Sequence, residues 1–103
     1  MNSLLYEKVR RLKLRYEQEG FVVVGVFGSY ARNEERRTSD LDVIYRLTPD
    51  FLSRYVGWDS LVRIDHIQAE FEKELGIPVD LANQNALDAV GKHFILPEVV
   101  PVA

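Results

Sequence analysis

The chain of 103 residues contains no cysteine, which excludes a disulfide framework and any cysteine-ligated zinc or iron–sulfur site. Long apolar runs are also missing. The longest, FVVVGVF at residues 21–27, is far too short to span a bilayer, and the first residues lack the apolar block of a signal peptide. We therefore expect a soluble, cytoplasmic protein that does not insert into a membrane.

An excess of charge of one sign is absent as well. The 13 basic and 16 acidic residues leave a net charge of −3, which argues against nucleic-acid binding driven by bulk charge. The basic run within residues 7–15 is open to two interpretations, a solvated helix face or a contact for an acidic partner or RNA. The sequence has no internal repeat or low-complexity segment, and its length predicts one domain over residues 1–103.

Apolar spacing predicts alternating helices and strands. Helices are expected at 3–20, 60–76 and, more weakly, 85–94, and strands at 21–27, 41–47 and 77–82. The first strand is apolar on both faces, as in a strand covered by helices on both sides. The pattern predicts an α/β fold, a small mixed sheet of about three to four strands covered by helices. No form is predicted for residues 48–60, where the aromatic residues either pack or cover a base, or for the tail from 96 onwards.

Two helix faces make up the expected core. Ser60 or Asp59 is expected to cap the second long helix and Gly76 to end it, while Gly20 closes the first. The side chains expected to be buried are Leu5, Val9, Leu12 and Tyr16 on the first helix, and Leu61, Ile64, Ile67 or Gln68, Phe71 and Leu75 on the second.

Two aspartates stand at the start of the second strand. Because side chains alternate along a strand, Asp40 and Asp42 project from the same face, about 7 Å apart. Carboxylates that close raise each other's pKa unless a positive charge lies between them. Water at an exposed edge supplies part of that screening, and a hard divalent cation supplies more. The pair is therefore either a solvated strand end or part of a metal site.

A glycine–serine turn precedes this pair. Gly28 lets the backbone turn tightly or approach a ligand, and Ser29 is predicted to cap a short helix that begins there. A helix N-terminus offers free N–H groups to an anion such as phosphate. A phosphate cradle next to a metal site indicates a metal–nucleoside triphosphate.

The arrangement of Gly28 and Ser29, ten intervening residues and then Asp40-Leu41-Asp42 resembles the signature of the DNA polymerase beta-like nucleotidyltransferase superfamily. The sequence motif GSYAR…SDLDV is similar to that of the minimal nucleotidyltransferases, the MntA-type antitoxins paired with HEPN-domain toxins. The resemblance runs from the first predicted strand to PVDLA at residues 78–82. That family commonly has glycine where this chain has Asn33; asparagine is the next-best residue if this position is left-handed.

The resemblance implies a nucleotidyltransferase fold and a site with three carboxylates. Asp40, Asp42 and Asp80 would be catalytic and bind two Mg²⁺ ions, while Gly28, Ser29 and Arg32 would bind the phosphates of ATP. From the residues alone, Asp80 needs a partner in its short apolar strand, either a metal or an arginine. Arg32 is equally open to a surface ion pair.

The activity implied is transfer of AMP from ATP to a protein hydroxyl, that of a tyrosine of a cognate HEPN-domain ribonuclease toxin. The protein would then silence this toxin as an antitoxin and form a hetero-oligomer with it. Two alternatives stay open. One is a non-catalytic antitoxin that neutralises its partner by occlusion, and the other is a transferase acting on a small molecule or an RNA end, against which the negative charge counts.

Overall fold

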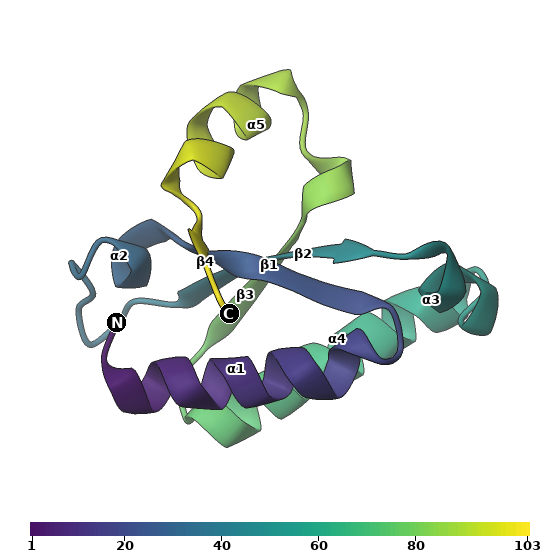
Figure 1. Ribbon diagram of the computed structural model, residues 1–103, viewed down its shortest axis with the longest axis horizontal. Coiled ribbons are helices and arrows are strands. Elements are labelled where there is room, and N and C mark those ends of the chain that lie inside the picture. The colour runs from purple at the N-terminus through teal and green to yellow at the C-terminus, as the bar shows by residue number, and fades with distance from the viewer.

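A four-stranded mixed sheet organises the computed structural model, which describes residues 1–103 (Figure 1). The elements in chain order are α1 (Ser3–Glu17), β1 (Phe21–Phe27), α2 (Gly28–Ala31), β2 (Leu41–Leu47), α3 (Pro49–Arg54), α4 (Trp58–Leu75), β3 (Val79–Asn83), the 3₁₀ helix η1 (Gln84–Ala86), α5 (Ala89–Ile95), the 3₁₀ helix η2 (Leu96–Glu98) and β4 (Val100–Pro101). The α/β fold with a small mixed sheet is confirmed.

The strands lie in the order β3-β2-β1-β4. β1 runs antiparallel to β2 and to β4, whereas β2 and β3 are parallel. The parallel pair needs a long connection, which α3 and α4 provide. None of the helices combines the length and the apolar character needed to cross a bilayer.

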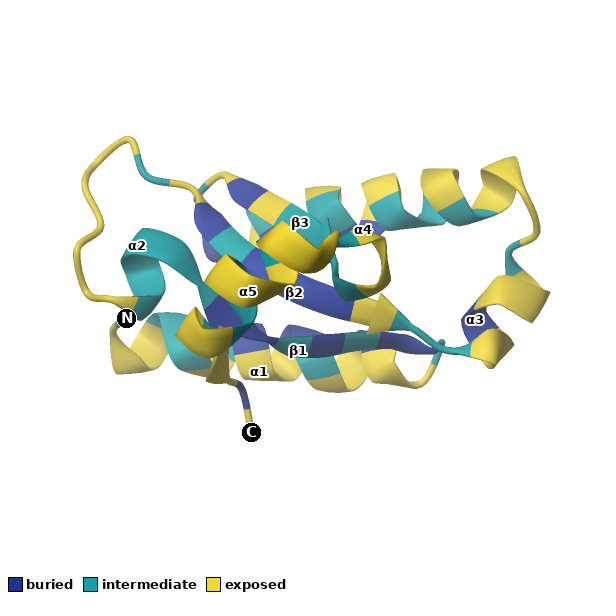
Figure 2. Cartoon of the chain, turned by 90° about the horizontal axis from the view of Figure 1, so that it is seen from above, coloured by how far each residue is buried: buried dark blue, intermediate teal, exposed yellow.

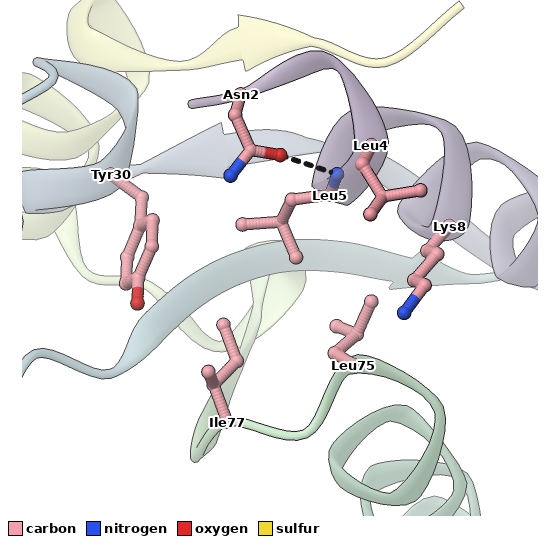
Figure 3. Close-up of a pocket in the computed structure, with 7 residues that line it drawn as sticks. All are labelled: Asn2, Leu4, Leu5, Lys8, Tyr30, Leu75 and Ile77. Carbon is pink, nitrogen blue, oxygen red and sulfur yellow. Dashed lines mark hydrogen bonds between the residues drawn. The ribbon is translucent and has the colours of Figure 1, made fainter.

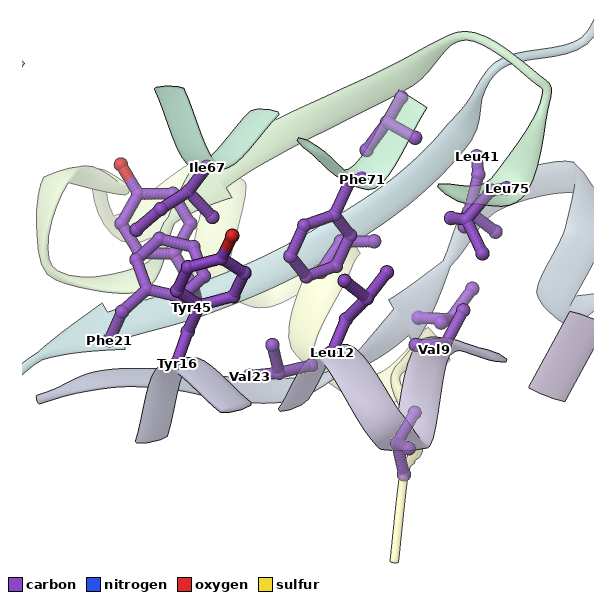
Figure 4. Close-up of a cluster of buried hydrophobic side chains, with 14 of the residues drawn as sticks. Val9, Leu12, Tyr16, Phe21, Val23, Leu41, Tyr45, Ile67, Phe71 and Leu75 are labelled. Atoms are coloured by element: carbon purple, nitrogen blue, oxygen red, sulfur yellow. The ribbon is translucent and has the colours of Figure 1, made fainter. Parts of the chain in front are cut away.

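One face of the sheet is covered by α1 and α4, which lie together beneath it in Figure 1. Their buried side chains meet those of β1 and β2 in a single apolar cluster (Figure 4). In this cluster the rings of Phe21 and Tyr45 stack with centroids 4.5 Å apart, and Phe71 meets Phe21 edge-on. The predicted core positions Val9, Leu12 and Tyr16 on α1 and Ile67, Phe71 and Leu75 on α4 are all buried. Leu5 and Ile64 are partly buried against the cluster, and α4 ends at Gly76 as predicted, with this glycine in the left-handed conformation.

The opposite face of the sheet carries only the segment from η1 to η2, which arches over it in Figure 1. No residue of α5 is buried, as the exposed colouring of this helix in Figure 2 shows. Ile44 is fully buried on this face, where η1 contacts β2, but Val22 and Val24 are only half-buried. The expectation that helices cover β1 on both faces is therefore only partly correct.

The start of α4 differs from the prediction. The helix begins at Trp58, and its N-cap is Gly57, not Ser60 or Asp59; the Ser60 hydroxyl instead donates to the Gly57 carbonyl over 2.8 Å. Leu61, predicted to be in the core, is 52% exposed, and Trp58 is 81% exposed. The reason is that α4 begins to pack against the core only at Ile64, one turn further on.

Two further elements lie in segments for which the sequence predicted no secondary structure. Residues 49–54 form α3, whose N-cap is the side chain of Thr48, and Phe51 in it is fully buried. The tail supplies β4, which pairs with Gly25 and Val26 of β1. A Cβ atom on Gly25 would lie 2.4 Å from the Val100 carbonyl oxygen, so only glycine lets the two strands approach this closely.

A half-buried ion pair joins the turn after α1 to α4, at the end of the sheet remote from α2. Two nitrogens of the Arg63 guanidinium donate to the Glu19 carboxylate over 2.8 and 2.6 Å, and the Tyr55 hydroxyl donates to the same group over 2.6 Å. The Arg63 hydrogen bond is the largest cause of the lowered pKa of Glu19; burial opposes it and Tyr55 adds to it. A charged acceptor held by several donors stabilises the fold more than an exposed pair does.

We expect Glu19→Gln to lower the free energy of unfolding at neutral pH by about 1–3 kcal/mol. Because the folded-state pKa of Glu19 lies below the ordinary value of 4.5, its stabilisation is complete above 4.5 and is lost as pH falls through the folded-state value. Denaturant unfolding should therefore show a gap between the variant and wild type that closes at acid pH. Glu17→Gln, which removes an exposed i,i+4 pair with Lys13, should cost under about 0.5 kcal/mol. An equal cost for the two variants would contradict this account of Glu19.

Candidate functional site

The corner formed by the ends of β1, β2 and β3 brings together most of the residues predicted for the site. In the sheet, Phe27 at the end of β1 pairs with Asp42 of β2, and Asp42 pairs in register with Asp80 of β3. In-register residues on neighbouring strands project from the same face. Asp42 and Asp80 are therefore side-chain neighbours on the face opposite α1 and α4.

Gly28 lies directly against this carboxylate pair. Its φ of +73° is in the left-handed region, and a Cβ atom there would lie 2.1 Å from Oδ2 of Asp42. Glycine is thus required twice, by the backbone conformation and by the closeness of Asp42. The prediction that Gly28 makes the turn tight is confirmed.

The predicted capping role of Ser29 is wrong. The short helix α2 begins at Gly28, and its N-cap is Phe27, which makes no side-chain hydrogen bond. α2 thus begins two residues before Tyr30, where a cap at Ser29 would start the helix. At the other end of α2 the backbone turns at Asn33 with a φ of +57°, a left-handed conformation that asparagine tolerates.

Asp40 precedes β2, two residues before Asp42, and is exposed. Asp42 is half-buried, and this burial is the main cause that raises its pKa. The charges of Asp80 and Asp40 raise the pKa further, while Arg32 lowers it. Like-charged groups held together in this way favour a bound cation, because the cation removes their repulsion.

No three acidic or histidine side chains form a group that could hold a metal ion. The chemistry of the donors nevertheless suits a hard cation, since Mg²⁺ prefers carboxylate oxygens in combination with substrate phosphates. The fit rests on the register of Asp42 and Asp80, the proximity of Gly28 and the repulsion felt by Asp42.

Arg32 follows α2 and makes ion pairs at the edge of this corner. Its Nε donates to Glu34 over 3.0 Å, and its Nη1 lies 3.3 Å from an oxygen of Glu98 in η2. The surface ion pair that the sequence left open is thus present. Glu34 is close in the sequence and could have been expected as a partner, whereas Glu98 is 66 residues away and no sequence pattern points to it.

A hollow of about 210 Å³ lies away from the carboxylates, between α1, α2 and the end of α4 (Figure 3). Its lining is mostly apolar and consists of Asn2, Leu4, Leu5, Lys8, Tyr30, Leu75 and Ile77. It contains no carboxylate. The carboxylates that the sequence predicts for the site therefore lie at the corner and not in this hollow.

Comparison with known proteins identifies the family of the chain. Residues 9–100 match the family model of the nucleotidyltransferase domain. The chain is 34% identical over 85 residues to MJ0435 of Methanocaldococcus jannaschii, named as a candidate protein adenylyltransferase, with 82% of this chain and 83% of that one covered. It is 31% identical over 102 residues to the protein adenylyltransferase MntA of Thermococcus cleftensis, covering 99% and 92%.

Two solved structures share the fold. The first is described as a candidate minimal nucleotidyltransferase and superposes with a TM-score of 0.75 at 27% identity, covering 98% of this chain and 96% of that one. The second, from a toxin–antitoxin crystal structure with AMP-PNP, has a TM-score of 0.60 at 17% identity and covers 82% and 61%, a likeness of fold alone. The chain therefore belongs to the nucleotidyltransferase domain family, and it is a nucleotidyltransferase.

Proposed function

We propose that this nucleotidyltransferase transfers AMP from ATP to a hydroxyl group of a partner protein. The observation that carries the proposal is the in-register pair of Asp42 and Asp80 beside Gly28, which places two carboxylates next to a tight turn that a phosphate chain can approach. The names of the relatives support the choice of a protein acceptor, since both refer to protein adenylyltransferases.

In this proposal Asp40, Asp42 and Asp80 would hold two Mg²⁺ ions. Such ions would lower the pKa of the attacking hydroxyl and neutralise charge on the departing pyrophosphate. The protein's own part is to position the reactants and accept a proton. Free backbone N–H groups at Gly28 and Ser29 receive the terminal phosphates, with Arg32 beside them.

The bond changes balance without a further reactant. The acceptor oxygen forms a bond to the α-phosphorus of ATP while the bond from this phosphorus to the pyrophosphate oxygen breaks. The proton of the acceptor hydroxyl passes to the carboxylate of Asp80, which is exposed and therefore accessible to an incoming acceptor. The products are the adenylylated protein and pyrophosphate.

The acceptor that we propose is a tyrosine of a HEPN-domain toxin, which the modification silences in the cytoplasm. This part rests on the resemblance of GSYAR…SDLDV to MntA-type antitoxins and on the relative named MntA. The domain, residues 1–103, leaves Asp80 exposed, so a hetero-oligomer with the acceptor protein would complete the site.

The position of the label in ATP tests the reaction. The protein should be incubated with Mg²⁺, a purified HEPN-domain partner and ATP labelled either at the α- or at the γ-phosphate. We expect stable label on the partner from α-labelled ATP only, and none when EDTA removes the metal. Label from the γ-phosphate would show phosphoryl transfer and contradict the proposal. Inhibition of the partner without any label would favour neutralisation by occlusion.

A further inference from the structure

Two glutamates hold the guanidinium group of Arg32. Glu34 accepts from Nε over 3.0 Å, and Glu98 accepts from Nη1 with its two oxygens at 3.3 and 3.4 Å. Both partners and Arg32 itself are about half exposed. A single positive charge is thus shared between two negative ones.

The two glutamates come from different parts of the fold. Glu34 lies in the loop that leads from α2 to β2, whereas Glu98 ends η2, directly before β4 joins β1 at Gly25 and Val26. The bond from Arg32 to Glu98 therefore ties the arched C-terminal segment to the loop at the carboxylate corner. Arg32 is also close enough to Asp42 to lower the pKa of that carboxyl group.

These contacts oppose the binding of an anion. A phosphate that approaches Arg32 meets a guanidinium already neutralised by two carboxylates, with Asp42 nearby. A guanidinium pairs well with phosphate when its fork of donors is free. Here Nε and Nη1, which lie on different edges of the guanidinium, are engaged, so a phosphate that uses either donor has to displace Glu34 or Glu98.

We infer that Glu98 competes with the nucleotide phosphates for Arg32 and thereby lowers the affinity of the site for ATP. The inference rests on the proposed function, in which Arg32 contacts the phosphates. Glu98 is the partner that can leave, because it belongs to another segment, whereas Glu34 is two residues from Arg32 and moves with it. Displacing Glu98 also frees η2 from the loop, which couples nucleotide binding to the position of the arched segment.

Affinity measurements on charge variants test this competition. Glu98→Gln keeps the shape of the side chain but removes its charge, and exposed ion pairs of this kind are worth about a two- to five-fold change in affinity. We expect Glu98→Gln to tighten equilibrium binding of Mg²⁺–ATP by that factor and to lower KM, while kcat stays within about two-fold. Arg32→Gln should weaken binding, and adding Glu98→Gln to it should then have no effect.

Glu35→Gln is the matched control. Glu35 is in the same loop as Glu34 and is exposed, but it forms no ion pair, so its neutralisation should leave ATP affinity unchanged. A direct readout is the NMR signal of the Arg32 Nε–H group, which should shift on adding Mg²⁺–ATP to wild type. Thermal unfolding of each variant shows whether it remains folded.

The competition is overturned if Glu98→Gln leaves the affinity for Mg²⁺–ATP unchanged or weakens it, or if Glu35→Gln tightens this affinity equally. It is also overturned if Glu98→Gln still tightens the affinity of the Arg32→Gln variant. Failure of the proposed function has a different signature: wild type would bind no Mg²⁺–ATP, or would bind it without transferring AMP. If wild type binds no Mg²⁺–ATP, the competition is overturned as well. If it binds Mg²⁺–ATP without transferring AMP, the ATP affinities of the variants still decide whether Glu98 competes for Arg32.

Discussion

Replacing Asp42 with asparagine should lower AMP transfer at least about 100-fold, the scale expected when a charged group at a reacting centre is removed. Asp42 is the central carboxylate of the corner, paired in register with Asp80 and covered by Gly28. Asparagine keeps the shape of the side chain but cannot supply the negative charge that holds a divalent cation. Initial rates with α-labelled ATP measure the effect.

The same substitution should stabilise the folded protein in metal-free buffer. Burial and the charges of Asp80 and Asp40 raise the pKa of Asp42, so its ionised form is disfavoured in the folded state at neutral pH. Asparagine removes that cost, and the melting temperature should rise while activity falls. Groups held in an unfavourable state are characteristic of functional sites.

Asp65→Asn serves as the control for Asp42→Asn. Asp65 is exposed on α4, forms no ion pair and lies outside the carboxylate corner. Its replacement should leave the rate unchanged and alter the free energy of unfolding by less than about 0.5 kcal/mol. If Asp42→Asn retains half of the wild-type rate, Asp42 is not the central metal-binding carboxylate.

The second large effect is expected from the substitution Gly28→Ala. The left-handed conformation costs a residue with a Cβ atom about 1–2 kcal/mol, and the new methyl group would lie 2.1 Å from Oδ2 of Asp42. Asp42 must therefore move, and displacing a reacting group by about 1 Å can lower a rate about 100-fold. We expect loss of both stability and AMP transfer, measured by denaturant unfolding and by initial rates.

The substitution Gly76→Ala separates the cost of backbone strain from the effect of displacing Asp42. Gly76 has a φ of +70°, close to that of Gly28, but a Cβ atom there would have no heavy atom within 4 Å. It should show the conformational cost of about 1–2 kcal/mol without a change in rate. Equal rates for the two alanine variants would mean that the contact between Gly28 and Asp42 has no part in catalysis.

The sequence predicted the elements that carry strong periodicity or a specific conformation. The buried stripe from Ile67 to Leu75 and the end of α4 at Gly76 are both present, because local patterns determine them. The start of α4 was misplaced because Ser60 is a good cap by residue type, yet the chain turns earlier, at Gly57. Leu61 fits the apolar spacing but lies before the helix reaches the core.

Long-range contacts could not be predicted in this way. The register that pairs Asp42 with Asp80 depends on how β2 and β3 align, and the residues of the two strands do not reveal this alignment. The short strand β4 has no alternation to reveal it and depends on the close approach of Val100 to Gly25. The contact between Arg32 and Glu98 follows from that pairing, which brings η2 to the carboxylate corner.

A crystal structure with Mg²⁺ and a non-hydrolysable ATP analogue tests most directly whether the carboxylate corner is the nucleotide site. We expect metal density between the carboxylates of Asp42 and Asp80, and the terminal phosphates against the backbone of Gly28 and Ser29. A nucleotide bound in the apolar hollow beside Tyr30, or metal bound away from Asp42 and Asp80, would contradict the account.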